Sequence, residues 1–299
     1  MAEARICAVV VNYNAGPLLA ELATSLAGQP GLSELIVVDN ASSDGSLGLL
    51  EAGQIRGIPL RVVKNLDNRG FAAACNQGAA LAGGRHLLFI NPDCRMAAGA
   101  LARLTALLES HPDAGMAGPL ILNADGSEQR GCRRYLPDPR RALMRVLGLG
   151  KPDAAGRVAA FDLAGTPLPA GPAEVEAISG ACMLVRSEAF EELDGWDEGY
   201  FLHCEDLDLC LRIGRAGFKV MFVPDAVVNH AQGASSRRRP VFVLWHKHRG
   251  MWRYFSKFQR AASPLWLVAL VWFGIWCRFL MLTPVVWLGS FSGDHARGA

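Results

Sequence analysis

The sequence predicts an α/β fold with a doubly wound sheet, followed by a helical tail. Three observations support this prediction. Short β-branched runs alternate with helical stretches in the first hundred residues. Hydrophobic residues make up 51% of the 299 residues and charged residues 19%, which provides a sizeable core and excludes general disorder. The last quarter of the chain is basic and rich in tryptophan.

The expected strands are short and apolar on both faces, which is typical of central strands in a parallel sheet. Pro17 is well placed to open the first helix, because leucines follow it at helical spacing. We expect strands over 6–11, 35–38, 60–64, 86–90, 176–185 and 218–223, and helices from Pro17, over 70–81 and over 204–216.

Polar side chains follow three of these strands. Ligands of open α/β sheets sit beyond the carboxyl ends of the strands, where Asn12, Asp39, Asn91 and Asp93 would gather. Each also has a plainer interpretation. Asp39 could cap the next segment, and Asn-Pro-Asp at 91–93 is also an ordinary turn.

The segment 124–175 differs in composition from its neighbours. It is rich in proline, glycine and arginine, and we expect a mobile basic loop with one short helix near 140–147. This loop divides the body into a nucleotide-binding half, 1–123, and a half for acceptor and base, 176–236. Residues 237–299 form the tail.

The net charge of +2 hides an asymmetry. Residues 1–225 hold 20 basic and 27 acidic residues, whereas 226–299 hold 10 and 1. The small total argues against a nucleic-acid partner, and the basic tail indicates a segment that faces anions or a membrane.

The tail contains six of the seven tryptophans. Its apolar run 264–277 is interrupted by Arg278, and the following run is broken by Pro284, so we expect no full span. A membrane-surface helix or hairpin fits this pattern better. The alternative is a helical pair that packs on the body or on a second copy of the chain.

Several site types are excluded. The eight cysteines are scattered without a CxxC pair, which argues against a zinc site or a disulfide framework. Neither a P-loop nor a GxGxxG fingerprint is present. Since no signal peptide is visible, we expect the chain to face the cytosol.

The segment 195–212 concentrates acidic side chains. Asp208 and Arg212 are four residues apart and can pair, which gives Asp208 a structural role. Asp206 should point toward the sheet, where a carboxylate needs a task or a partner. Glu205 could cap the helix. His230 follows an apolar strand, and a nearby aspartate would make it a ligand rather than a structural histidine.

Taken together, these segments resemble family 2 glycosyltransferases, and within them bacterial rhamnosyltransferases that act on polyprenyl-diphosphate-linked sugars. The resemblance runs from about residue 6 to residue 260 with its blocks in order. The blocks are Val10–Asn14, Val37–Ser46, Asn68–Gly78, Phe89–Asp93, Ser179–Arg186 and Glu205–Arg212, with His230 before Gly233.

The resemblance implies a GT-A fold, Rossmann-like with a doubly wound mixed sheet, and an inverting transfer that depends on Mg²⁺ or Mn²⁺. Asp93 and His230 would hold the metal, and Asp206 would be the general base. Asn91 stands where the family's Asp-x-Asp motif has its first acid, which leaves fewer anionic ligands. The implied donor-binding residues are Asn12, Tyr13, Asp39, Asn68, Gly70, Asn91 and Asp93.

The implied donor is a dTDP- or UDP-sugar, and the implied acceptor is a lipid-linked saccharide at the cytoplasmic face of the inner membrane. The tail could hold the acceptor's diphosphate, attract anionic lipid without specificity, or form a homodimer. Two other functions remain open: a sugar nucleotidyltransferase and a non-catalytic nucleotide-binding protein. The candidate acceptor-binding residues are Trp196, Glu205, Arg237, Arg239, His246 and His248.

Overall fold

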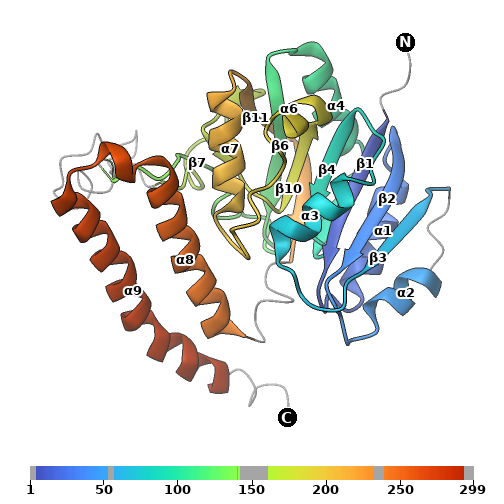
Figure 1. Ribbon diagram of the computed structural model, residues 1–299. Coiled ribbons are helices and arrows are strands. Elements are labelled where there is room, and N and C mark those ends of the chain that lie inside the picture. The colour runs from blue at the N-terminus through green and yellow to red at the C-terminus, as the bar shows by residue number, and fades with distance from the viewer. Residues whose placement is uncertain (1–4, 53–56, 140, 142–160, 232–238, 293–299) are drawn as a thin grey trace.

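The computed structural model describes residues 5–52, 57–139, 141, 161–231 and 239–292. A mixed sheet forms its centre, with strands in the order β3-β2-β1-β4-β10-β6-β11-β5 and β8 paired to β11 (Figure 1). The strands of this sheet are β1 (Ile6–Asn12), β2 (Leu32–Asp39), β3 (Leu60–Lys64), β4 (His86–Ile90), β5 (Cys94–Met96), β6 (Ala114–Leu122), β8 (Ala173–Glu174), β10 (Cys182–Arg186) and β11 (Lys219–His230).

Helices cover both faces of the sheet, and each face has its own hydrophobic cluster. A second, two-stranded sheet pairs β7 (Arg133–Arg134) with β9 (Ala177–Ile178). The helices are α1 (Leu18–Ala27), α2 (Ser46–Ala52), α3 (Phe71–Ala79), α4 (Ala100–Ser110), α6 (Ser187–Glu192), α7 (Glu205–Arg215), α8 (Pro240–Phe258) and α9 (Leu265–Ser292).

The predicted mixed, doubly wound sheet is confirmed. β1 pairs in parallel with β2 and β4, and the register places Asn12 beside Asp39. β10 runs antiparallel between β4 and β6. Because β1, β2 and β4 run in one direction, their carboxyl ends meet at one edge, as the sequence predicted.

Two predicted strands have different bounds. The strand expected over 176–185 is broken into β9 and β10, because the backbone N–H of Gly180 turns away to donate to Asp206. The strand expected over 218–223 continues to His230 as β11, with an irregularity between Val223 and Val227 in its pairing with β6. The sequence analysis did not identify α4, β5 or β6.

The expected mobile loop lies partly outside the described residues, at 142–160, as does most of the short helix expected near 140–147. Ion pairs lie within this segment and also connect it to the 176–236 half. Arg133 bonds to Glu128 at 2.8 Å, and Arg141 bonds to Glu176 at 2.7 Å.

The tail forms an antiparallel hairpin of α8 and α9 beside α7 (Figure 1). The expectation of no full span relied on the interruptions at Arg278 and Pro284, yet α9 continues as one helix through both residues. Pro284 removes one backbone donor, while Thr283 donates its hydroxyl to the Phe279 carbonyl at 2.8 Å. By length and composition, residues 265–289 could cross a membrane, with a mean hydropathy of 2.0.

Candidate active site

Polar side chains from adjacent strands bond to one another at the carboxyl edge of the sheet. Asn12 donates its Nδ2 to Asp39 Oδ1 at 2.7 Å, and the backbone N–H of Ser42 donates to Asp39 Oδ2 at 3.1 Å. Asn12 is fully buried and Asp39 nearly so, whereas Tyr13 is half-buried beside them. The fold therefore brings these three predicted donor-binding residues together, and it gives Asn12 the task of holding Asp39.

A second group of amides supports the same edge. Asn65 Nδ2 donates to Asn40 Oδ1 and to Gln77 Oε1, each at 2.8 Å. Asn40 donates in turn to the Gly70 carbonyl at 3.1 Å and faces Asn68 Oδ1 at 3.3 Å. The sequence analysis missed Asn40, Asn65 and Gln77, although all three lie in or between the blocks that carried the resemblance.

The edge that carries Asn12, Asp39 and the amides around Asn40 is called the donor side. Gly70 connects it to the loop that precedes α7. Its φ is +89°, and a Cβ at this position would lie 2.8 Å from the carbonyl oxygen of Phe201. The next residue, Phe71, donates its backbone N–H to the same oxygen at 2.9 Å. Glycine is required here both by the backbone conformation and by the close approach.

Asp93 and His230 are in contact, as a shared metal site would require. His230 Nε2 lies 3.0 Å from Asp93 Oδ1, and both side chains are about nine-tenths buried. His230 Nδ1 lies 2.6 Å from Gln129 Oε1, so an Nδ1–H donated to Gln129 leaves Nε2 free for a metal. The neighbour that the sequence analysis required beside His230 is therefore present, and Gln129 is a further residue that it missed.

The oxygen and nitrogen atoms that Asp93 and His230 offer as ligands fit a hard divalent cation. The ligand atoms of Asp93, Cys94 and His230 lie within 4.8 Å of one another. Carboxylate oxygen and imidazole nitrogen suit Mn²⁺ and Mg²⁺ better than a thiol does. The Cys94 thiol is buried and donates to the Ala181 carbonyl at 3.4 Å. Asp93 and His230 are the residues that could hold the ion.

Asp206, at the start of α7, is held from two directions. Its Oδ2 accepts a bond from Gly180 N–H at 3.2 Å and one from Arg134. The segment with Gly180 also contacts the turn that carries Asp93, which is called the metal side. The Ala181 carbonyl accepts the Asn91 N–H at 2.9 Å. The break between β9 and β10 therefore joins Asp206 to the Asn91–Asp93 turn.

The acids on either side of Asp206 have different surroundings. Asp208 is fully buried, and it pairs with Arg212 at 2.5 Å and with Lys257 of α8 at 2.7 Å. The predicted pairing with Arg212 is therefore present. Glu205 is buried, and its Oε2 has no hydrogen-bond partner in the described part of the chain. Burial and the nearby Asp206 raise the pKa of Glu205 to about 8. The side chain makes no helix cap.

The loop before α7, residues 199–204, is called the base loop here. His203 and Cys204 have positive φ values of 67° and 71°, a conformation that non-glycine residues seldom adopt. α8 packs directly on them: a Cβ on Gly250 would lie 2.6 Å from the His203 carbonyl oxygen. The His246 ring stacks on Phe201 at a centroid distance of 4.5 Å. The tail thus supports the loop that precedes Asp206.

The predicted acceptor-binding residues are spread over several environments. Trp196 is buried against Phe89 with ring centroids 5.2 Å apart. His248 is fully buried and lies between the Leu244 carbonyl, at 2.7 Å, and Arg278, at 3.1 Å. Arg239 precedes α8, and Arg237 lies outside the described residues. Their role in acceptor binding stays a prediction.

The fold and this edge define a class of protein, the α/β enzymes of GT-A architecture. Two solved structures have a similar fold. Mannosyltransferase PcManGT from Pyrobaculum calidifontis, in complex with GDP-Man and Mn²⁺, aligns with a TM-score of 0.58 at 18% identity over 100% of this chain and 77% of that chain. GalNAc-T7 with UDP, GalNAc and Mn²⁺ aligns with a TM-score of 0.58 at 19% identity over 88% of this chain; the chain spans 52% of its length.

The chain belongs to glycosyl transferase family 2, whose family model matches residues 7–164. The model of glycosyl transferase family group 2 matches residues 160–293. N-acetylglucosaminyl-diphospho-decaprenol L-rhamnosyltransferase from Mycobacterium tuberculosis is 31% identical over 82% of this chain and 85% of its own length. Rhamnosyltransferase WbbL from Escherichia coli is 48% identical over 17% of this chain and 19% of its own. The chain is therefore a glycosyltransferase that uses a nucleotide-sugar donor.

Proposed function

We propose that the chain is an inverting, metal-dependent rhamnosyltransferase. It transfers L-rhamnose from a dTDP- or UDP-linked donor to a hydroxyl of a saccharide carried on a polyprenyl diphosphate. The mycobacterial relative, named for such an acceptor, supports the substrate class over most of the chain. The observation that carries the proposal is the segment 180–181, which bonds to Asp206 on one side and to the Asn91–Asp93 turn on the other.

Inversion by direct displacement needs one base and one electrophile. Asp206 is the base that takes the proton of the acceptor hydroxyl. Its bonds to Gly180 and Arg134 fix the orientation of the carboxylate. A second carboxylate nucleophile is not required, unlike in a retaining glycosidase.

Asp93 and His230 would hold the divalent ion, and Gln129 would keep the imidazole in the orientation that ligation needs. Bound Mg²⁺ or Mn²⁺ supplies positive charge to the departing diphosphate. Asn91, the neutral member of the motif, fixes the turn through its backbone N–H bond to Ala181. Asp39, Tyr13 and the 68–70 turn face the nucleoside.

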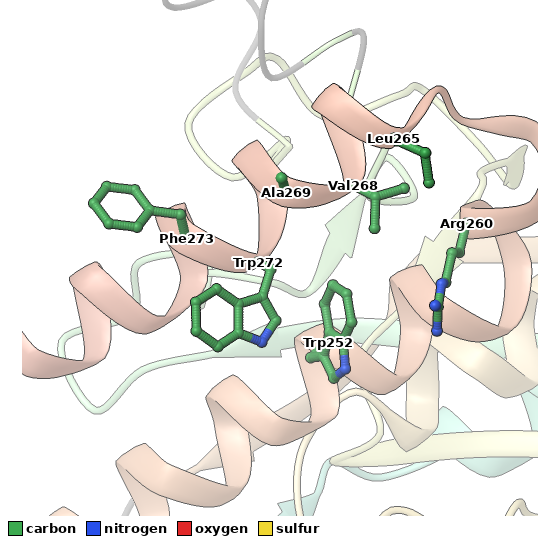
Figure 2. Close-up of a pocket in the computed structure, with 7 residues that line it drawn as sticks. All are labelled: Trp252, Arg260, Leu265, Val268, Ala269, Trp272 and Phe273. Carbon is green, nitrogen blue, oxygen red and sulfur yellow. The ribbon is translucent and has the colours of Figure 1, made fainter.

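The hairpin attaches the enzyme to the membrane without crossing it. α9 follows α8 along its length, as the contact between Trp245 and Trp276 at 5.0 Å indicates. Figure 2 shows Trp252 of α8 and Trp272 of α9 facing one another across a pocket of about 520 Å³. A perpendicular α9 would draw the cations of α8 to bilayer depth, which is costly. α9 therefore lies in the interface at the cytoplasmic face of the inner membrane.

A transfer assay tests this function. Purified protein is first screened by thermal shift against dTDP- and UDP-sugars with and without Mn²⁺, and then given a farnesyl-diphosphate-linked N-acetylglucosamine. We expect stabilisation by dTDP-rhamnose that needs the metal, and transfer that inverts the anomeric centre. A retained anomeric configuration, or full activity in EDTA, would contradict the mechanism. Sedimentation with anionic vesicles at low salt tests the attachment, and a protein left in the supernatant would make the hairpin a dimer interface.

A further inference from the structure

The cations of α8 fall into two groups. Arg253 and Lys257, near its end, pair with Asp197 of the body at 2.7 and 2.6 Å. Lys247 and Arg249, nearer its start, have no acidic partner in the described part of the chain. The same holds for Arg278 of α9, whose guanidinium lies 3.1 Å from the neutral acceptor His248 Nε2. Arg253 and Lys257 attach the hairpin to the body through these ion pairs. The unpaired cations make no such attachment.

Lys247 and Arg278 lie beside the base loop. The backbone carbonyl of Lys247 is 4.0 Å from Cys204 Sγ, and the absence of a Cβ at Gly250 allows this approach. His248, the next residue of α8, carries the contact to Arg278. The hairpin therefore brings one cation from each of its helices toward the loop that ends at Asp206.

Positive charge is crowded here. Burial, and then the charges of Arg278, Arg134 and Arg130, lower the pKa of Lys247. Burial and Lys247 likewise lower the pKa of His203, to about 4, so this imidazole adds no charge near neutral pH. Arg134 is already bonded to Asp206, and Arg130 contacts Asp162 only at 3.4 Å. Lys247 and Arg278 remain without an acidic partner in the described residues, and cations left uncompensated in this way are typical of a site that receives a polyanion.

We propose that Lys247 and Arg278, with Arg130 at the margin, bind the diphosphate of the lipid-linked acceptor. This inference rests on the proposed function and names a subsite within it. A nucleoside or a neutral sugar could not compensate several cations, whereas a diphosphate can. Arg278 belongs to the apolar helix, so a diphosphate bound there has its lipid chain against α9 and its first sugar toward the base loop. This subsite is narrower than the sequence-based expectation, which gave the diphosphate to the whole basic cluster of the tail, and it adds Arg278 of α9. That cluster comprises Arg237, Arg238, Arg239, His246, Lys247, His248 and Arg249.

Variants of full-length protein in detergent test the site: Lys247→Gln, Arg278→Gln and the charge-preserving Arg278→Lys. Arg249→Gln is the matched control. Arg249 is, like Lys247, an exposed cation of α8, but a separation of two residues places it on a different face of the helix. The KM for farnesyl-diphosphate-linked N-acetylglucosamine should rise about tenfold or more in each glutamine variant. The KM for the donor should not change, and Arg278→Lys should retain most of the affinity. An acceptor KM like that of Arg249→Gln would overturn the inference.

A binding experiment separates this inference from the function itself. Inorganic pyrophosphate is titrated calorimetrically in EDTA, where the metal side is inactive, so no turnover is needed. We expect wild type and Arg249→Gln to bind it, and Lys247→Gln to bind it at least tenfold more weakly. Equal binding by all proteins would overturn the site even if transfer is observed. The variants are also sedimented with phosphatidylglycerol vesicles. If vesicle binding falls in the same variants whose acceptor KM rises, the cations bind lipid headgroups, and the diphosphate site is overturned.

Discussion

The donor side and the base side of the active site are built differently. On the donor side, residues at the ends of neighbouring strands bond to one another, as Asn12 does to Asp39. On the base side, Asp206 depends on segments far apart in the chain: Gly180, Arg134 and the hairpin that supports the base loop. The Asn12–Asp39 pair forms within the sheet, whereas the surroundings of Asp206 also need the tail. The two sides touch at Gly70 and at segment 180–181, so variants away from these contacts should affect one side more than the other.

The largest effect is expected at the base. Asp206→Asn preserves shape and can still accept the Gly180 bond, but it cannot take a proton. Turnover should fall roughly 10²–10⁴-fold, with donor binding little changed because the substitution keeps the shape of the side chain and the bond from Gly180. Initial rates and a thermal shift with donor measure the two quantities. Wild-type turnover would transfer the role of base to another residue, with Glu205 next.

The metal side should respond in the opposite manner. Asp93→Ala and His230→Ala each remove a ligand, so Mn²⁺-dependent binding of dTDP or UDP should weaken by about 10–100-fold or more. Calorimetry with Mn²⁺ and with EDTA gives the metal-dependent part. Asp113→Ala is the control, because Asp113 forms an ion pair with Lys219, at 2.6 Å, that lies away from the site. Nucleotide binding in Mn²⁺ that is as strong in both variants as in wild type would contradict the assignment.

The dependence of the base side on the hairpin can be tested with one pair of glycines. Gly250→Ala places a methyl group against the His203 carbonyl, whereas Gly274→Ala, on α9, meets nothing within 4 Å. Gly250→Ala should lower the free energy of unfolding by about 1–3 kcal/mol and reduce turnover. Gly274→Ala should leave the stability unchanged or raise it. Thermal unfolding and acceptor kinetics measure both. If Gly250→Ala leaves turnover unchanged, the base loop does not need α8.

The smallest expected effect concerns pH. The pKa of Glu205 is raised to about 8 from its usual 4.5. A carboxyl group whose folded pKa is raised stabilises most below the unfolded pKa, and this contribution is lost as the pH rises toward the folded value. Between about pH 7 and pH 8, the free energy of unfolding of wild type should fall by about 1 kcal/mol relative to that of Glu205→Gln. Denaturant unfolding at each pH measures it, with exposed Glu188→Gln as control. Parallel curves for wild type and Glu205→Gln would contradict it.

The same contrast explains what the sequence could predict. Strand ends are readable because apolar runs stop at polar residues, so Asp39, Asp93 and the contact of Asp93 with His230 could be anticipated. Gln129 and Arg134 could not, since they lie in a segment whose composition indicates a loop. Their positions depend on the β7–β9 pairing and on the break at Gly180. No local pattern carries that information.

The tail was predictable in character but not in geometry. Tryptophans and unmatched cations indicated a membrane-facing segment, and Arg278 and Pro284 were the reason to expect no full span, but the sequence did not show that one helix runs through both residues. Arg278 is accommodated because His248 of the paired helix accepts its hydrogen bond. Such a partner arises only from the fold.

The pairing of α8 with α9 has a geometric consequence for substrate choice. α8 is bound to the body by the Asp197 and Asp208 pairs, and α9 follows α8. If α9 lies in the interface, as proposed above, Asp206 is held at a constant height above the lipid headgroups. The acceptor would then be selected by the reach of its glycan: a hydroxyl one sugar too close to the lipid, or one too far from it, would miss the carboxylate even when its stereochemistry is correct.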